Sequence, residues 1–324
     1  MSRPDYRPPP WLPGRHLQTL WPLACEGPLP PYQRERWATP DGDFIDLDWL
    51  PGPVDAPLVV LFHGLEGSSR SHYARALMTA LQGQGWRGVV PHFRGCSGEP
   101  NRQLRAYHSG DSGEIHWILQ RLRTDLPSAQ PLFAAGVSLG GNALLKWLGE
   151  QGSQAQALVG GAAAICPPLD LALSGRALGQ GLNRLYTRHF LSTLKPKALL
   201  KAARHPGRLD LDAIRRATTL HAFDNAYTAP VHGFRDTDDY WRQASSRPWL
   251  GAIRVPTLLL SARNDPFVPP GALPEPSALS PQVRFECLAE GGHGGFVSGP
   301  WPGHLGWLPA RLLAHFSALA PDEP

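Results

Sequence analysis

The stretch from Pro131 to Asn142, PLFAAGVSLGGN, restricts the fold of this chain more than any other. Its first half, Leu132–Ala135, is an apolar run typical of a buried parallel strand, and apolar residues at helical spacing follow Asn142. Between them, Gly136–Gly140 reads G-x-S-x-G. A strand, a tight turn with one serine, and a helix form the context of a nucleophile elbow. The glycines suit a strained turn where strand and helix nearly collide. We therefore predict that Ser138 is a nucleophile held above a sheet.

The segments around this stretch alternate between apolar strands and helices. We predict further strands at Leu58–Phe62, Trp86–Phe93, Ala157–Ile165, Val255–Ser261 and Val283–Leu288, and helices from near Ser71, around Gly113–Arg123 and at Leu305–Phe316. Such alternation predicts an α/β fold with a mostly parallel central sheet flanked by helices. With the elbow, it indicates the α/β-hydrolase fold.

A hairpin is predicted before the first parallel strand, at Arg34–Leu50. Its turn is Asp41-Gly42-Asp43, and Asp-Gly is a strong turn signal. The apolar residues after the turn partly alternate with acids at 43, 46 and 48. We interpret these acids as the solvated face of an edge strand.

Four regions follow along the chain. Residues 1–33 are rich in proline and contain Trp11 and Trp21, which predicts an arm without long helices, packed on the body. Residues 34–166 form the first part of the core. In residues 167–249 the alternation stops and basic residues lie among leucines at helical spacing, so we predict a helical cap inserted after the strand near 158–166. Residues 250–324 complete the core.

The partners of the serine are expected on loops after later strands, in the order serine, acid, histidine. Asp265 directly follows the strand LLLSARN, and His293 follows VRFECLAE in a glycine-rich loop. His293 would take the serine proton and return it to the leaving group, while Asp265 would hold the imidazole tautomer. Asp265 in Asn-Asp-Pro could instead be only a turn former, and His293 is one of 13 histidines.

An oxyanion hole needs two backbone N–H groups, one after the nucleophile and one from the loop after the first central strand. Leu139 supplies the first. Leu65 in His63-Gly64-Leu65 supplies the second, because Gly64 lets the backbone approach closely. We interpret His63 as a residue that orients this loop, and the Cys96-Ser97 loop as a structural turn near the site. The His205–Asp210 spacing resembles that of some acyltransferases, but we assign it to the solvated surface of the cap.

The composition indicates no cofactor and no metal. The four cysteines, Cys25, Cys96, Cys166 and Cys287, are far apart and form no C-x-x-C pair, which argues against zinc and against a secreted disulfide scaffold. Free thiols suit a reducing cytoplasm, and the proline-rich N-terminus is unlike a secretory signal. We therefore expect a cytoplasmic protein.

The charge of the chain is mild. A formal net charge of +4 and the lack of nucleic-acid-binding signatures argue against a nucleic acid partner. No apolar run is long enough for a transmembrane segment. The basic residues of the cap form a solvated face or contact an anionic lipid, acyl-CoA or phospholipid head group. The oligomeric state is open.

Several blocks carry a family resemblance: HLQTLWP (16–22), PDGDFIDLDW (40–49), LFHGLEGSSRSHYA (61–74), PHFRGCSGEPN (91–101), YHSGD (107–111), GVSLGGN (136–142), NDPFVP (264–269) and EGGHGGF (290–296). The chain resembles the YheT-like hydrolases along nearly its whole length. This group belongs to the hydrolase-4 branch of the α/β-hydrolases and is related to eukaryotic lipid esterases. The resemblance implies a charge-relay set at Ser138, Asp265 and His293, and esterase-type activity on acyl esters.

We therefore predict a serine hydrolase that cleaves carboxylic esters of acyl or lipid-like type through an acyl-enzyme, with the cap shaping an apolar acyl pocket. An acyltransferase or thioesterase could use the same triad, with an alcohol or acyl-CoA as the second substrate. A catalytically silent α/β-hydrolase fold acting as a binding module is the third alternative. The acyl chain length and the natural substrate do not follow from the sequence.

Overall fold

The computed structural model describes residues 6–25 and 27–320. Their strands form one eight-stranded sheet in the order β1-β2-β4-β3-β5-β6-β7-β8. The strands are β1 (Gln33–Ala38), β2 (Phe44–Leu50), β3 (Leu58–Phe62), β4 (Arg87–Pro91), β5 (Leu132–Val137), β6 (Gly161–Ile165), β7 (Thr257–Ala262) and β8 (Val283–Leu288). The pairs β1/β2 and β2/β4 are antiparallel, and all other neighbours are parallel. The predicted hairpin and mostly parallel sheet are confirmed.

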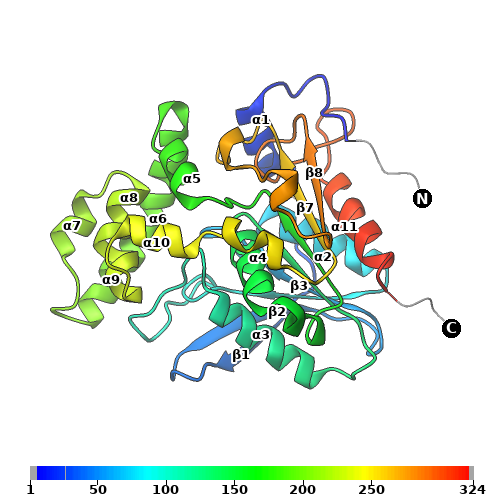
Figure 1. Ribbon diagram of the computed structural model, residues 1–324, viewed down its shortest axis with the longest axis horizontal. Coiled ribbons are helices and arrows are strands. Elements are labelled where there is room, and N and C mark those ends of the chain that lie inside the picture. The colour runs from blue at the N-terminus through cyan, green and yellow to red at the C-terminus, as the bar shows by residue number, and fades with distance from the viewer. Residues whose placement is uncertain (1–5, 26, 321–324) are drawn as a thin grey trace.

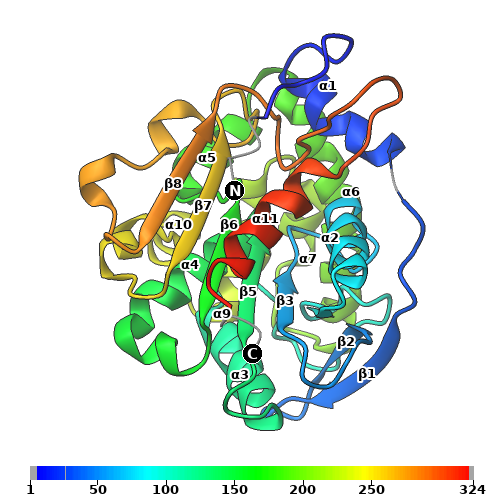
Figure 2. The same ribbon diagram turned by 90° about the vertical axis from the view of Figure 1, so that its right-hand side faces the viewer.

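Helices cover both faces of the sheet (Figures 1 and 2). On one face, α2 (His72–Gly83) and α11 (Trp307–Ser317) pack against Val59 and Leu61 of β3. On the other face, α3 (Ser112–Asp125) and α4 (Leu139–Gln151) pack against Leu58, Val60 and Phe62. Successive strand residues thus point to opposite faces, and both are buried, which explains the continuous apolar run of β3.

The helices of residues 171–244, between β6 and β7, lie outside these two layers, on the left in Figure 1. We call residues 171–244 the cap. Its elements are α5 (Leu171–Leu178), a 3-10 helix (Gly181–Asn183), α6 (Arg184–Arg204), α7 (Leu211–Arg216), α8 (Leu220–Phe223), a π-helical turn (Asp224–Thr228), α9 (Ala229–His232) and α10 (Thr237–Ala244). Their buried side chains form small clusters separate from those on the two faces of the sheet.

The chain returns from the cap to the core beside α4. Asn142, fully buried, donates from Nδ2 to the carbonyls of Ser109 (2.7 Å) and Ala244 (2.8 Å) and accepts from the Ser246 N–H at 2.9 Å. One amide on the helix after the elbow therefore satisfies three backbone groups where cap and core meet. Shorter helices complete the chain at Gly152–Ala157, Arg247–Ala252, Pro270–Ala272 and Pro276–Ala278.

The N-terminal segment contains one short helix, α1 (Arg15–Leu20), followed by a 3-10 helix at Trp21–Ala24. Residues 1–5 and 26 of the expected arm lie outside the described residues. The described part is packed: Leu12 is buried with Val297 and Leu305, and the Trp11 and Trp21 side chains donate to the carbonyls of Gly299 and Pro302.

Two sequence interpretations need correction. Asp43, Asp46 and Asp48 are not a solvated face, because they are 0%, 2% and 4% exposed. β2 is not an edge strand, since β1 and β4 flank it, and its acids bind cations: Arg34 pairs with Asp48 and Arg36 with Asp46, both at 2.7 Å. The strand predicted from Ala157 begins only at Gly161, because Gly152–Ala157 is helical.

Candidate active site

Ser138 lies at the turn between β5 and α4. Its φ of 53° and ψ of −119° are a strained backbone conformation for a residue with a side chain. A Cβ at Gly136 would come within 2.5 Å of the Gly140 carbonyl oxygen, and one at Gly140 within 2.3 Å of the Phe62 oxygen. Both glycines are therefore required for β5, α4 and β3 to meet here, and the turn has the geometry of a nucleophile elbow.

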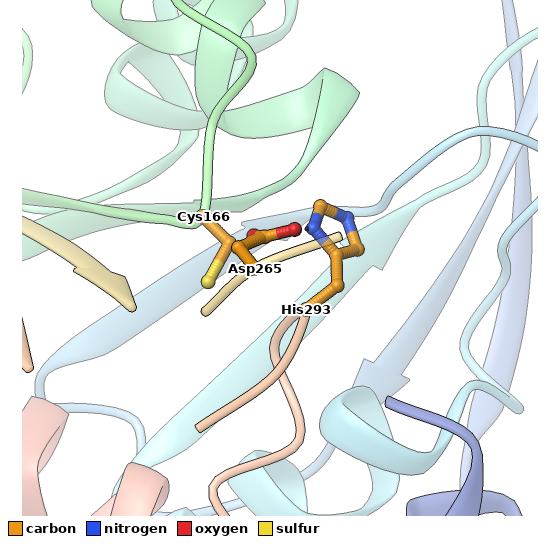
Figure 3. A group of neighbouring side chains, drawn as sticks. All are labelled: Cys166, Asp265 and His293. Atoms are coloured by element: carbon orange, nitrogen blue, oxygen red, sulfur yellow. Dashed lines mark hydrogen bonds and ion pairs between the residues drawn. The ribbon is translucent and has the colours of Figure 1, made fainter. Parts of the chain in front are cut away.

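Asp265 and His293 are in direct contact at the carboxyl ends of β7 and β8 (Figure 3). His293 Nδ1 lies 2.8 Å from Asp265 Oδ2. The other carboxylate oxygen, Oδ1, accepts from the backbone N–H groups of Phe267 (2.8 Å) and Val268 (3.3 Å). The carboxylate is 1% exposed and the imidazole 10% exposed. Asp265 is therefore fixed by its own loop and presents one oxygen to the histidine.

Ser138 and His293 line the same cavity, while the described hydrogen bonds include none between the serine hydroxyl and the imidazole. The structure thus brings Asp265 and His293 into contact and puts Ser138 on the cavity wall that His293 also lines.

In the loop after β3, three of the four amides from Gly64 to Gly67 have acceptors. Gly64 N–H donates to the Tyr73 hydroxyl at 2.8 Å, Glu66 N–H to the Tyr107 hydroxyl at 3.0 Å, and Gly67 N–H to the Gly64 carbonyl at 3.0 Å. Among the hydrogen bonds of the described chain, the Leu65 N–H has no acceptor. Of these four amides, that of Leu65 is free to bind a developing oxyanion.

The second predicted donor, the Leu139 N–H, is at the first position of α4, where helix geometry leaves the amide without an intrahelical partner. The positive end of the helix dipole lies at the same point and favours negative charge. Leu65 and Leu139 both line the cavity that holds Ser138.

His63 orients the loop after β3. Its side chain is fully buried, Nδ1 bonds the Gly64 carbonyl at 2.8 Å, and Nε2 accepts from the Phe93 N–H at 3.0 Å. Burial, with a smaller effect of nearby His92, lowers the pKa of His63 to about 3. A neutral imidazole with both nitrogens occupied fixes the loop and is not available as a base.

A cavity of about 430 Å³ extends from Ser138 between core and cap. The α6 side chains on its wall are Phe190, Leu194, Lys197 and Lys201, spaced so that they share one face of the helix. The remaining wall is mainly apolar: Leu65, Ala106, Leu139, Pro168, Leu171, Leu178, Leu220, Phe223, Tyr227, Tyr240, Trp241 and Phe267. A mainly apolar lining that also carries polar groups is typical of a ligand site.

Two lysines of α6 tie the cap to loops of the core. Lys197 pairs with Glu66, beside Leu65, at 2.9 Å. The Tyr107 hydroxyl also donates to the Glu66 carboxylate, at 2.8 Å. Lys201, 5% exposed, donates to the carbonyls of Gln103 (2.8 Å) and Arg105 (2.7 Å), and burial lowers its pKa to about 8. Lys201 is therefore not on the solvated surface to which the sequence pattern assigned the basic residues, whereas the Lys197 side chain is 41% exposed.

Cys166 lies beside the Asp265–His293 pair, and one ligand atom from each residue lies within 4.8 Å of the others (Figure 3). Burial first, and the Asp265 carboxylate second, raise the pKa of the Cys166 thiol well above its usual value. A metal would require the thiolate. The three groups therefore fit a histidine oriented by Asp265, with the neutral Cys166 thiol packed beside it, better than they fit a metal centre.

Sequence reasoning missed the residues that support the site. Glu66, Tyr73 and Tyr107 hold the loop after β3, and Lys197 reaches that loop from the cap. A signal was present for the lysines, since Lys197 and Lys201 are one helical turn apart among leucines, but it does not distinguish a cavity wall from a wet surface.

A parallel sheet between helices, an elbow serine and a histidine–aspartate pair on later loops define an α/β hydrolase. Comparison with known proteins agrees: residues 57–300 match the family described as alpha/beta hydrolase fold, and the chain belongs to this family.

Relatives of this chain carry names of ester-cleaving enzymes. The chain is 41% identical over 304 residues to the Escherichia coli protein YheT, whose name marks its esterase activity as unconfirmed, covering 92% of this chain and 88% of that one. It is 32% identical over 309 residues to the mouse phospholipase ABHD3, covering 92% and 74%. The chain is therefore a hydrolase of the branch that acts on esters.

A solved structure is similar in fold. The Pyrococcus furiosus esterase Pf2001 superposes with a TM-score of 0.58 at 14% identity, covering 91% of this chain and 98% of that one. Among the described residues, no helix combines the length and apolar character that crossing a membrane demands.

Proposed function

We propose that the protein is a serine hydrolase that cleaves carboxylic esters of acyl or lipid-like type through an acyl-enzyme on Ser138. The observation that carries the proposal is that His293, hydrogen-bonded to Asp265, lines the same cavity as the strained elbow serine.

In the proposed first step, Ser138 Oγ attacks the ester carbonyl carbon and its proton passes to His293 Nε2. Asp265 keeps Nδ1 protonated and stabilises the imidazolium. The negative oxygen of the tetrahedral intermediate is bound by the N–H groups of Leu65 and Leu139. The intermediate collapses, the C–O bond to the alcohol breaks, and the alcohol leaves with the proton from Nε2.

In the second step, water replaces the alcohol. His293 takes a proton from the water, hydroxide adds to the acyl carbon, and the bond to Ser138 breaks as the serine recovers a proton. The products are one carboxylic acid and one alcohol. The predicted core regions, 34–166 and 250–324, would perform this chemistry, while the predicted insertion, 167–249, which contains the cap, would enclose the acyl chain in the apolar cavity.

The test is steady-state hydrolysis of p-nitrophenyl esters of increasing chain length by wild type and Ser138→Ala. We expect turnover by wild type, with an initial burst if deacylation is slow, and turnover reduced about a million-fold or more in the variant. Equal rates in the two proteins would refute the assignment. Faster release of p-nitrophenol on adding an alcohol, with an ester as product, would favour the acyltransferase alternative.

We also propose that the cap contacts anionic lipid surfaces peripherally. From Leu171 to Leu209 the chain contains lysines and arginines but no aspartate or glutamate. Leu182 and Leu185 in this stretch are 65% and 64% exposed. Exposed leucines among basic residues suit the head-group region of a bilayer.

Co-sedimentation with phosphatidylglycerol vesicles, compared with phosphatidylcholine vesicles, tests this contact. We expect binding only to the anionic vesicles and its loss in Leu182→Ser/Leu185→Ser. No binding to either vesicle would refute it. We further propose a cytoplasmic location, which the four unpaired cysteines suit.

A further inference from the structure

We propose that α1 is part of the catalytic apparatus, and that Thr19 and Gln18 are positioning residues that hold the loop of His293. This inference rests on the proposed function, in which His293 is the base. It assigns a role to the HLQTLWP block at 16–22, which none of the catalytic steps uses.

Thr19 binds the backbone of His293 itself. The His293 N–H donates to Thr19 Oγ1 at 3.0 Å, across 274 residues of sequence. The same hydroxyl donates to the Arg15 carbonyl at 2.7 Å, one turn earlier in α1. The hydroxyl orientation is thus fixed by the helix, and its oxygen accepts the amide of the histidine.

Gln18 joins the histidine loop to the loop of the acid. Its side chain is 1% exposed, and Oε1 accepts from the Gly291 N–H (3.0 Å) and from Asn264 Nδ2 (2.8 Å). Asn264, next to Asp265, accepts in turn from the Gly292 N–H at 3.0 Å. A single buried amide therefore connects the residue before the acid with the loop that carries the base.

The glycines around His293 explain why an external support is needed. Gly292 and Gly294 have φ of 62° and 71°, so the loop adopts conformations that glycine permits and that its own sequence constrains little. A Cβ at Gly292 would lie 2.7 Å from the Gln18 carbonyl carbon, and one at Gly295 would lie 2.3 Å from the Gln18 oxygen. The loop packs directly on α1, and the ordering comes from that contact.

A purely structural role would affect stability alone, whereas a positioning role affects turnover at constant stability. The pair Thr19→Val and Thr19→Ser separates the two. Valine keeps the size and removes the acceptor, while serine keeps the hydroxyl. Thr124→Val is the matched control, because Thr124 Oγ1 also donates one turn back, to the Gln120 carbonyl at 2.9 Å, and Thr124 is an exposed residue of α3.

We expect Thr19→Val to lower kcat for a p-nitrophenyl ester roughly tenfold, since small misplacements of a reacting group carry costs of this order. KM should stay within about twofold, because Thr19 is not among the residues that line the cavity. Thr19→Ser and Thr124→Val should retain wild-type kcat, and all variants should have similar melting temperatures. Wild-type kcat in Thr19→Val, or an equal loss in Thr19→Ser, would overturn the proposal.

A second measurement does not depend on hydrolysis. In ¹⁵N-histidine-labelled protein, the Nδ1–H resonance of His293, bound to Asp265, should be sharp in wild type and Thr19→Ser and broadened in Thr19→Val. Unchanged spectra would overturn the positioning role. If wild type hydrolyses no ester but Thr19→Val still broadens this resonance, the proposed function fails while the positioning of His293 by α1 stands.

Discussion

The core and the cap are built by different means. In the core, two large apolar clusters lie on the faces of one sheet, and the elements meet so closely that Gly136 and Gly140 admit no side chain. In the cap, the helices enclose small clusters, and polar contacts such as Lys197–Glu66 reach the core. Ser138, Asp265 and His293 all belong to the core, whereas much of the cavity wall belongs to the cap.

From this difference we infer that the core and the cap have different roles. Groups that must be placed within fractions of an ångström lie on loops fixed by a tightly packed sheet, where small displacements are costly. Groups that we propose only enclose the acyl chain lie on helices of the cap, where volume-conserving substitutions should be tolerated. Changes in the core should therefore alter the rate of reaction, and changes in the cap should alter which substrate reacts.

After Ser138→Ala, the largest effect is expected for Asp265→Asn. The amide keeps the size of the side chain but favours the wrong tautomer of His293, which in a comparable triad lowers turnover by about 10⁴. The measurement is kcat on a short p-nitrophenyl ester, with circular dichroism to verify folding. A loss below about tenfold in a folded variant would remove Asp265 from the proposed triad.

Acid should destabilise the loop after β3. Since the pKa of buried His63 is about 3, below its ordinary 6.5, the unfolded chain takes up a proton first as pH falls. The contribution of neutral His63 to the free energy of unfolding is complete above pH 6.5 and is lost as the pH falls toward 3. Between pH 7 and pH 5 this loss is about 2 kcal/mol.

Urea unfolding at pH 7 and pH 5 measures this loss, and His63→Gln should reduce its pH dependence. His232 in the cap provides the comparison, because burial also lowers its pKa to about 3. If core and cap unfold together, His232→Gln has the same effect on the single transition. A separate transition altered only by His232→Gln would show that the cap unfolds alone.

Much of the core could be predicted from the sequence, because its signals are local. The G-x-S-x-G turn between a strand and a helix located Ser138, and placement after late strands selected Asp265 and His293. The burial of Asp46 and Asp48 was not predictable, since Arg36 and Arg34 compensate their charge across the β1/β2 register. A strand pattern of acids and apolar residues looks the same with or without such partners.

The cap and the arm were less predictable for a similar reason. Helical spacing indicates helices but not the surface they face, so the contact of Lys197 with Glu66 could not be read from it. Gln18 accepts a hydrogen bond from Gly291, a residue 273 positions away. The sequence around Gln18 contains no pattern that indicates this partner. Contacts of this range arise only once the whole chain is folded.

Leu194 tests the role of the cap wall. Leu194→Trp reduces the cavity, and Leu194→Ala enlarges it. We measure kcat/KM for a long and for a short p-nitrophenyl ester and take the ratio of the long ester to the short one. This ratio should fall roughly tenfold in Leu194→Trp and rise roughly tenfold in Leu194→Ala. The kcat on the shortest ester should hardly change, since no catalytic group moves. Equal changes on all chain lengths would mean that this wall does not bind the acyl chain.

The smallest effect is expected where cap and core touch. Lys197→Met removes the ion-pair partner of Glu66, which lies beside the proposed oxyanion amide of Leu65. Because the pair is partly exposed, we expect its loss to lower kcat only about two- to fivefold. Lys197→Arg should restore the rate. Arg188→Met, a change of another exposed cation of α6, should have no effect. If the two methionine variants behave alike, the cap does not support the oxyanion loop through Lys197.

The most direct test of the account is intact mass after incubation with a fluorophosphonate, comparing wild type with Ser138→Ala. The account predicts a single adduct on wild type and none on the variant, because only an elbow serine activated by His293 and Asp265 should react. A folded wild type without an adduct, or an adduct retained by Ser138→Ala, would contradict the proposal that this core assembles a working nucleophile.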